Sequence, residues 1–210
     1  MRSGARICVI IPALNEQGAI GHVLDDIPGW VDEVLVVDNG STDRTSEVAA
    51  AHGARVLLEP RKGYGHACLT GMAHMKAPDV VVFLDGDYSD HPQEMDLVVD
   101  PILEGRADMV IGSRILGCRE RGALTPQSNL GNRLACGLLW LFWRGHCTDL
   151  GPFRAISRAA LESLEMEEPN YAWTIEMQVK AARTRLRVAE VPVSYRRRIG
   201  KSKVSGTVKG

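Results

Sequence analysis

The stretch VVFLDGDYSD, residues 81–90, joins an apolar run suited to a protein core to three carboxylates within six residues. A buried strand accounts for the apolar half, because such continuous runs are typical of strands covered on both faces. It does not account for Asp85, Asp87 and Asp90, since neighbouring carboxylates repel one another unless a cation or a proton lies between them. The strand must therefore end where such a partner can approach.

Similar apolar runs and helix-like segments alternate through the first half of the chain. The runs lie at residues 7–11, 34–37, 56–58, 80–84 and 109–111, and the helix-like segments at 19–27, 42–52, 65–75 and 92–103. This alternation predicts an α/β fold with a mostly parallel sheet and helices on both faces. Such sheets bind ligands at the carboxyl ends of their strands, so we expect the acids to lie on the binding edge.

The second half of the chain has a different texture. It contains a polar loop at residues 117–127, a helix at about 128–143, a loop and short strand at 149–157, helices near 158–164 and 171–184, and an extended segment at 188–195. No internal repeat or long linker separates it from the first half. With 210 residues, 45% of them hydrophobic, we expect one domain with a core of ordinary size.

Charge is balanced overall but concentrated at one end. The formal net charge is -1, which argues against a general nucleic-acid binder. Residues 191–210, however, hold six arginines and lysines and no acid. Such a segment predicts an anionic partner, a phosphate, a lipid head group or a nucleic acid, with a solvated tail as the alternative.

Five scattered cysteines without a CxxC pair argue against a disulfide framework or a sulfur metal site, and favour a reducing cytoplasm. The apolar runs are too short for a signal peptide or a membrane span. The longest, LACGLLWLFW at residues 134–143, predicts a buried core helix; contact with a membrane surface or a prenyl chain is the alternative.

The acid pair after the 80–84 strand predicts a metal site. Asp85 and Asp87 point to one side if the strand geometry continues, and Mg²⁺ or Mn²⁺ suits two carboxylates whose remaining ligands are water and phosphate. Gly86 allows a close approach of backbone and ligand, and Ser89 or Asp90 can lend another oxygen. The alternative is a plain turn.

Two other strand exits carry polar groups. In VVDNGSTDRT, residues 36–45, Asp38 is placed to accept hydrogen bonds from a base or ribose, although a capped turn uses the same residues. In IIPALNEQG, residues 10–18, Pro12 ends the strand and Glu16 follows in the loop. If these exits face one crevice, a cation and a polar nucleotide explain the crowding of acids.

A further segment, RKGYGHACLTGM at residues 61–72, can wrap a base or phosphates near a helix N-terminus, with a plain loop as the alternative. It is not a P-loop, and no GxGxxG follows the first strand, which disfavours a dinucleotide-binding fold.

Taken together, VIIPALNE, VVDNGSTDRT, FLDGDYSD with HPQEM, and ADMVIGSR resemble the inverting family 2 glycosyltransferases, most closely the polyprenyl-phosphate (dolichyl-phosphate) mannose and glucose synthases. The resemblance covers about residues 7–203. It implies a GT-A fold in one domain, residues 1–210, with a nucleotide-binding half to about 115 and an acceptor-binding half from about 116. It also implies a divalent metal at the DxD motif.

The resemblance assigns roles to individual positions. The metal would be held by Asp85 and Asp87, with Ser89 where the family has glutamine. The nucleotide would contact Pro12, Leu14, Glu16, Asp38, Gly40, Lys62, Gly63, Asp85 and Gly86. TDLGPFRAI resembles the family's TDxxSGF block, with Pro152 in place of a small residue. RRRIGKSK resembles its basic segment near the acceptor phosphate, and the register leaves open whether Arg197 or Arg198 is the matching arginine. The acceptor would contact Arg114, Arg154, Arg197, Arg198, Ser202 and Lys203, and the catalytic residues would be Asp87, Asp149 and Arg114.

These assignments predict transfer of a hexose from a UDP- or GDP-sugar in one inverting displacement. A hydroxyl acceptor needs a general base, whereas a lipid phosphate is already largely ionised. The basic C-terminal segment therefore favours a polyprenyl phosphate, used by a cytoplasmic protein at the inner face of the membrane. The alternatives are a saccharide or small-molecule acceptor, a sugar nucleotidyltransferase and a non-catalytic nucleotide-sugar-binding subunit.

Overall fold

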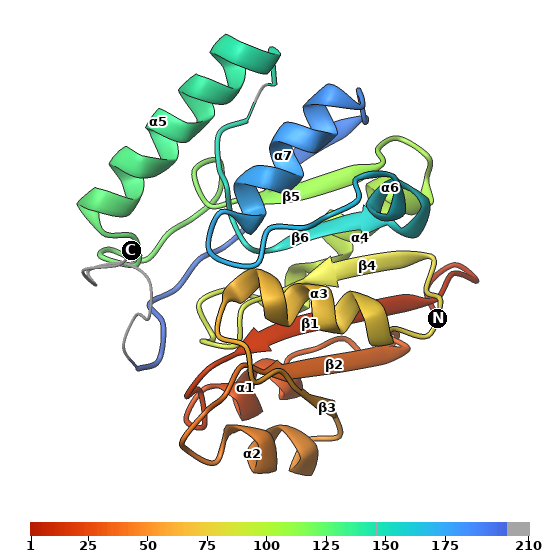
Figure 1. The fold of residues 1–210 in the computed structure, drawn as a ribbon, viewed down its shortest axis with the longest axis vertical. Helices are drawn as coiled ribbons and strands as arrows, with labels where there is room; N and C mark the ends of the chain where they lie inside the picture. Colours follow the sequence, from red (N-terminus) through yellow and green to blue (C-terminus); the bar gives the residue numbers. More distant parts are fainter. Residues whose placement is uncertain (146, 201–210) are drawn as a thin grey trace.

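The computed structural model describes residues 1–145 and 147–200 (Figure 1). Its centre is a seven-stranded sheet in the order β3-β2-β1-β4-β6-β5-β7. The strands are β1 Ile7–Ala13, β2 Glu33–Asp38, β3 Arg55–Leu58, β4 Val80–Phe83, β5 Met109–Ser113, β6 Arg154–Ser157 and β7 Val188–Pro192. All neighbours are parallel except β6, which runs antiparallel to β4 and β5. The predicted mostly parallel α/β architecture is confirmed.

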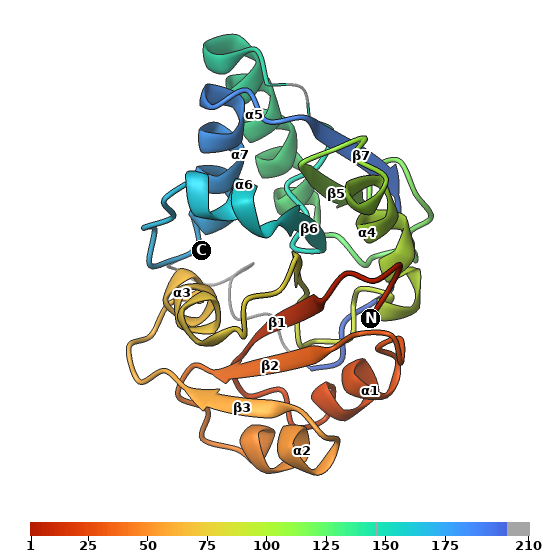
Figure 2. The same ribbon diagram turned by 90° about the vertical axis from the view of Figure 1, so that its right-hand side faces the viewer.

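Helices cover both faces of the sheet (Figure 2). They are α1 Ile20–Asp25, α2 Thr45–Ala51, α3 Tyr64–His74, the 3-10 turn η1 Pro92–Glu94, α4 Met95–Leu103, α5 Pro126–Trp143, α6 Arg158–Ser163 and α7 Trp173–Arg183. Apolar residues of α1, α2 and α4 join the core on one face, and those of α3, α6 and α7 join the core on the other. Because β1 and β4 are buried along their whole length, they read as continuous apolar runs.

Helix boundaries follow local hydrogen bonds. The helix predicted at 42–52 begins only at Thr45, with Arg44 as an N-cap that makes no side-chain capping bond; a turn precedes it, in which Asp43 accepts from the Thr45 backbone N–H at 3.0 Å. The helix predicted at about 128–143 begins two residues earlier, at Pro126, because Thr125 caps it by accepting from the Ser128 N–H at 3.1 Å. Strand β1 runs one residue past Pro12, which the sequence had predicted to end it.

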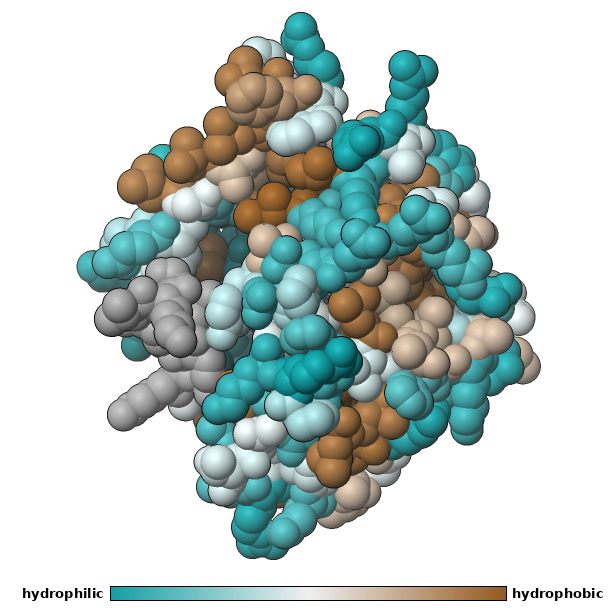
Figure 3. All heavy atoms as spheres, viewed as in Figure 1, coloured by the Kyte–Doolittle hydropathy of each residue, from teal (hydrophilic) through white to brown (hydrophobic). Residues whose placement is uncertain are grey.

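The prediction that the 134–143 run is buried in the core is wrong. In α5, Leu134, Leu141 and Phe142 are 62%, 60% and 66% exposed, and the buried side chains are Asn132, Cys136 and Leu139. The reason is that α5 lies outside the two main layers and packs along one side, against α7 (Figures 1 and 2). Figure 3 shows apolar surface over α5 at the upper left. Among residues 1–145 and 147–200, no helix has the length and apolar character needed to cross a bilayer.

Candidate functional site

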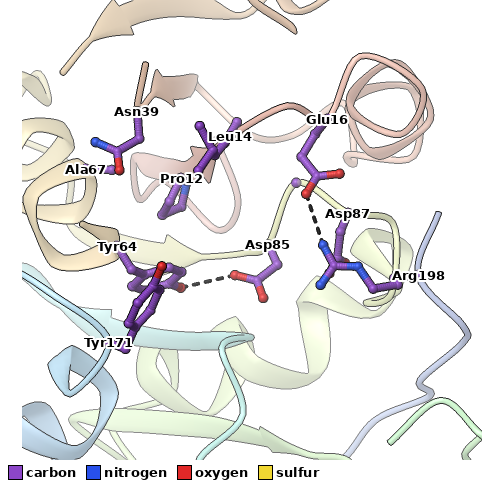
Figure 4. Close-up of a pocket in the computed structure, with 12 residues that line it drawn as sticks. Pro12, Leu14, Glu16, Asn39, Tyr64, Ala67, Asp85, Asp87, Tyr171 and Arg198 are labelled. Atoms are coloured by element: carbon purple, nitrogen blue, oxygen red, sulfur yellow. Dashed lines mark hydrogen bonds and ion pairs between the residues drawn. The ribbon is translucent and has the colours of Figure 1, made fainter. Parts of the chain in front are cut away.

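A cavity of about 100 Å³ opens where β1, β2 and β4 end, at the carboxyl edge of the sheet (Figure 4). It is lined by Pro12, Ala13, Leu14, Glu16, Asn39, Tyr64, Ala67, Asp85, Gly86, Asp87, Tyr171 and Arg198. The three strands are adjacent and parallel, so loops far apart in sequence meet here. This is the edge at which the strand pattern predicted a ligand site.

Asp85 projects into this cavity two residues after β4. The Tyr64 hydroxyl, at the first residue of α3, donates a hydrogen bond to Asp85 Oδ1 at 3.2 Å. Loss of hydration, together with the negative charge of Asp87, raises the pKa of Asp85 to about 7. Ionising both carboxylates at once is therefore unfavourable, and the site favours a proton or a cation beside Asp85.

Asp87 is held in place by the turn that follows it. The Ser89 backbone N–H and hydroxyl both donate to Asp87 Oδ1, at 2.9 and 2.5 Å. Ser89 is fully buried, so its hydroxyl orients Asp87 in this structure. Its predicted role as a third metal ligand stays a prediction.

Arg198 supplies positive charge to the acid cluster. Its guanidinium lies 3.2 Å from Asp87 Oδ2 and 3.0 Å from Glu16 Oε1. Backbone bonds from Ile199 N–H to the Asp87 carbonyl, 2.9 Å, and from Arg196 N–H to the Ser89 carbonyl, 2.9 Å, hold this segment over the strand exit. The guanidinium of Arg198 thus lies beside the carboxylates for which the sequence predicts a bound metal ion.

The donor set fits a hard divalent ion only in part. Asp85 and Asp87 offer carboxylate oxygens, the ligands that Mg²⁺ and Mn²⁺ prefer. Within residues 1–145 and 147–200, no cluster of three or more His, Cys, Asp or Glu side chains is arranged to hold a metal. An ion here would therefore draw its other ligands from water and from a substrate's phosphates, as Mg²⁺ sites often do.

Asp90 is a buried acid without a hydrogen-bond partner for either carboxylate oxygen within the described part of the chain. Burial, with the charges of Asp85 and Asp87, raises its pKa well above the usual range. An unpaired carboxylate of this kind is stable only when neutral or beside a cation. It adds to the demand for positive charge beneath the cavity.

The predicted nucleotide contacts are divided between the cavity and its surroundings. Pro12, Leu14, Glu16, Asp85 and Gly86 line the cavity, whereas Asp38, Gly40, Lys62 and Gly63 do not. Asp38 accepts hydrogen bonds from the Ser41 N–H at 2.8 Å and from the Ser46 hydroxyl. These bonds correspond to the capped turn that the sequence allows as the alternative to nucleotide binding.

Asn39, Tyr64 and Tyr171 line the cavity but were not among the predicted site residues. Asn39 donates to the carbonyls of Glu59 and Arg61 at 3.1 and 2.7 Å and accepts from the Gly63 N–H at 2.8 Å. It thereby joins the end of β2 to the loop before α3. The signal available in the sequence was its position directly after Asp38 at a strand exit.

Arg114 and Asp149 form a closed ion pair. Asp149 is fully buried and accepts from Arg114 Nε and a terminal guanidinium nitrogen, both at 2.7 Å, and from the Arg114 N–H at 2.8 Å. Burial alone would raise the pKa of Asp149, but the hydrogen bonds and charge of Arg114 lower it below its usual value. A carboxylate so stabilised is a poor proton acceptor, so the geometry suits Asp149 to anchoring Arg114 rather than to acting as a base.

Three predicted acceptor contacts, Arg114, Arg154 and Arg197, do not line the cavity. Arg154 is fully buried and donates to the backbone carbonyls of Leu150, Gly151 and Thr174, so it braces the 150–154 loop from beneath. The Arg197 side chain donates to the Arg121 carbonyl at 2.9 Å on the surface. Of the two arginines left open by the sequence, Arg198 is the one that lines the cavity. Ser202 and Lys203 lie outside the described residues.

Sequences of known proteins resemble this chain along most of its length. The profile described as glycosyl transferase family 2 matches residues 8–164. An uncharacterised glycosyltransferase of Mycobacterium tuberculosis is 35% identical, over 99% of this chain and 94% of that protein. A dolichyl-phosphate hexose transferase of Haloferax volcanii is 37% identical, over 94% of this chain and 86% of that protein.

Solved structures also resemble the chain along most of its length. Glucosyl-3-phosphoglycerate synthase from Mycobacterium tuberculosis, in complex with Mn²⁺, UDP-glucose and phosphoglyceric acid, superposes with a TM-score of 0.76 at 30% identity, over 96% of this chain and 74% of that chain. The complex of the same enzyme with Mn²⁺, UDP and glucosyl-3-phosphoglycerate gives a TM-score of 0.77.

Proposed function

Because the chain belongs to glycosyl transferase family 2, we propose that it transfers a hexose from a nucleoside-diphosphate sugar, with inversion, to an acceptor that carries a phosphate group. The observation that carries the proposal is the position of Asp85 and Asp87 at the exit of β4, in the cavity where three parallel strands end. This edge is where α/β sheets bind their ligands, and the acid pair there is matched to a metal-bound diphosphate.

A divalent ion, Mg²⁺ or Mn²⁺, would be held by Asp85 and Asp87. When bound, it supplies charge neutralisation to the diphosphate leaving group. The Mn²⁺ in the structurally similar synthase supports this assignment. The chain's own cation, Arg198, lies 3.2 Å from Asp87 and would bind phosphate oxygens in a protein whose Asp87 holds a metal.

The choice of acceptor chemistry depends on the acids in and near the cavity. Asp85 and Asp87 are assigned to the metal, and Glu16 is paired with Arg198. Asp149 is engaged with Arg114, and its lowered pKa disfavours proton uptake. A phosphate nucleophile is largely ionised near neutral pH and needs orientation more than deprotonation. Arg198, which lines the cavity, is suited to orient such an anion.

Two kinds of acceptor carry a phosphate group. In a lipid phosphate that group is itself the nucleophile, whereas a phosphoglycerate also offers a hydroxyl, whose attack would need a general base. The solved structures favour a small phosphorylated molecule, because the similar synthase was crystallised with phosphoglyceric acid; they support this alternative better than the lipid predicted from the sequence. A lipid phosphate is favoured by the Haloferax relative and by the outward apolar face of α5. The two are distinguished by where the labelled product partitions.

Radiolabelled UDP- and GDP-hexoses should be incubated with Mn²⁺ and either polyprenyl phosphate in detergent or 3-phosphoglycerate, followed by extraction into organic solvent. Label in the organic phase identifies the lipid acceptor, and a new labelled aqueous anion, separated by anion-exchange chromatography from the unreacted nucleotide sugar, identifies the small one. Asp87→Asn should abolish transfer, while Glu47→Gln, which removes an exposed carboxylate outside the cavity, should not. Transfer that survives Asp87→Asn and is indifferent to metal would refute the proposal.

The lipid alternative makes a separate prediction about α5. Its residues Leu130, Leu134, Leu138 and Leu141 are exposed along one side of the helix, at the spacing of one helical face. The helix contains Arg133, ends beside Arg144 and has no acidic residue. We propose that this face rests on an anionic bilayer, because apolar side chains flanked by arginines match its interface. A second copy of the chain packed against the same face of α5 would instead bring like-charged arginines close to one another.

Co-sedimentation with vesicles of phosphatidylglycerol and phosphatidylcholine tests this contact. The double variant Leu134→Gln/Leu138→Gln should lose at least about tenfold in partitioning, since each buried methylene contributes about 0.8 kcal/mol. Leu58→Gln, at a site that is 74% exposed on β3, is the matched control. Equal binding by both variants, or a stable dimer formed through α5, would overturn the proposal.

A further inference from the structure

Two cysteines lie side by side outside the candidate site. Cys136 belongs to α5, Cys147 lies in the loop before β6, and their sulfur atoms are 2.8 Å apart. Both are free thiols in this structure. Because the sulfurs of a disulfide are about 2.05 Å apart, a bond requires them to approach by less than about 1 Å.

The pair is open to small reagents. A cavity of about 350 Å³ is lined by Cys136, Gly137, Trp140, Cys147, Thr148 and Glu190. Cys147 donates its S–H to the Cys136 sulfur, and this hydrogen bond lowers the pKa of Cys136 below its usual value. Thiolates are the reactive form of cysteine, so Cys136 is the better nucleophile of the two.

We propose that Cys136 and Cys147 form a reversible intramolecular disulfide when the protein meets a low-molecular-weight disulfide oxidant. The Cys136 thiolate attacks one sulfur of the oxidant, forming a mixed disulfide and releasing one thiol. Cys147 then attacks the Cys136 sulfur, gives up its proton and releases the second thiol. One disulfide is reduced to two thiols as two protein thiols become one disulfide, so atoms and electrons balance.

The bond would tie α5 to the loop that carries Asp149. Asn132, one turn before Cys136 and on the same side of α5, already donates to the Thr148 carbonyl at 2.9 Å and accepts from the Leu150 N–H at 2.8 Å. A disulfide one turn further on would make this attachment covalent. Since the Asp149 carboxylate fixes Arg114, oxidation restrains the support of that arginine, whichever acceptor the protein uses.

Equilibration of the full chain in glutathione buffers, with alkylation and peptide mapping, tests the inference. We expect the free-thiol count to fall from five to three, a 136–147 linked peptide, and a melting temperature about 5–10 °C higher that dithiothreitol reverses. Cys118→Ser, at the exposed cysteine, should leave the linked peptide unchanged, whereas Cys136→Ser and Cys147→Ser should each abolish it.

The peptide map of the wild-type chain is sufficient to decide the outcome, so the test does not depend on whether a variant folds. The inference is overturned if glutathione accumulates on Cys136 without resolution by Cys147. It is equally overturned if the five thiols stay free in fully oxidised buffer, or if the linked peptides join other cysteines.

Discussion

Replacing Asp149 with asparagine should strongly destabilise the fold. The carboxylate is completely buried, and its partner Arg114 is 13% exposed. Asparagine keeps one acceptor oxygen but removes the charge, leaving a buried guanidinium without its counter-ion. Breaking a buried pair in this way costs about 3–5 kcal/mol, which for a chain of this size lowers the melting temperature by about 6–20 °C.

Urea and thermal unfolding followed by circular dichroism measure this loss. Asp108→Asn is the matched control, because Asp108 forms a similar pair with Arg187 at the surface, where the arginine side chain is 58% exposed; it should cost only about 0–1 kcal/mol. A loss below about 1 kcal/mol for Asp149→Asn, or equal losses for the two variants, would refute the anchoring role.

The pH dependence of the same variants gives an independent check. Because the folded pKa of Asp149 is lowered, its contribution is present in full above the unfolded pKa and is lost as the pH falls through the folded value. The stability difference between wild type and Asp149→Asn should therefore be constant near neutrality and shrink in acid. If Asp149 acted instead as a catalytic base, Asp149→Asn would lose activity but keep the stability of the wild type.

Three further predictions concern the cavity and its supports. Folding raises the pKa of Asp85 from 3.8 to about 7, so the metal-free protein should lose stability as the pH rises from about 4 to 7. For the same reason, the Mn²⁺ affinity measured by calorimetric titration should fall up to about tenfold for each pH unit below pH 7. A Mn²⁺ affinity that does not change with pH would contradict this. Arg198→Gln should raise the Mn²⁺ affinity of the nucleotide-free protein by about tenfold, because the ion competes with this guanidinium for Asp87. The same variant should bind UDP or GDP more weakly. Electron paramagnetic resonance measures the bound Mn²⁺, and an unchanged Mn²⁺ affinity would argue against competition. Gly65→Ala places a Cβ 1.9 Å from the Glu168 carbonyl oxygen and should cost about 1–3 kcal/mol in urea unfolding, whereas Gly131→Ala, with open space around it, should be neutral or stabilising by up to about 1 kcal/mol.

The edge of the sheet was predictable because it depends on local patterns. Continuous apolar runs identify strands buried on both faces, and polar residues directly after them identify the exits. The order of β2, β1 and β4 then brings Glu16, Asp85 and Asp87 together without further information. The antiparallel direction of β6 was not predictable, because the four residues of this strand carry no signal for the direction of long-range pairing.

Burial in the second half was the least predictable property. The length and composition of residues 134–143 fit a core helix, but the sequence does not tell whether another layer covers it, and none of the described elements covers the outer face of α5. Arg154 shows the opposite case. Its place in the TDLGPFRAI block suggested an acceptor contact, yet three backbone carbonyls accept hydrogen bonds from its side chain inside the protein. Side-chain chemistry alone does not separate these outcomes, because both are decided by distant packing.

The charge balance of the cavity argues for a divalent partner. Asp85, Asp87 and Asp90 lie under one strand exit with Glu16 beside them, and Arg198 bridges Asp87 and Glu16. The charge of Arg114 also acts on Asp85 and Asp90, but this guanidinium is paired with Asp149. Arg198 alone cannot neutralise the four carboxylates, and burial with mutual repulsion raises the pKa of Asp85 and Asp90, which favours their neutral forms. Protonation of that kind is lost near neutral pH at Asp85, where a doubly charged ion would replace the proton and free the arginine for an incoming diphosphate.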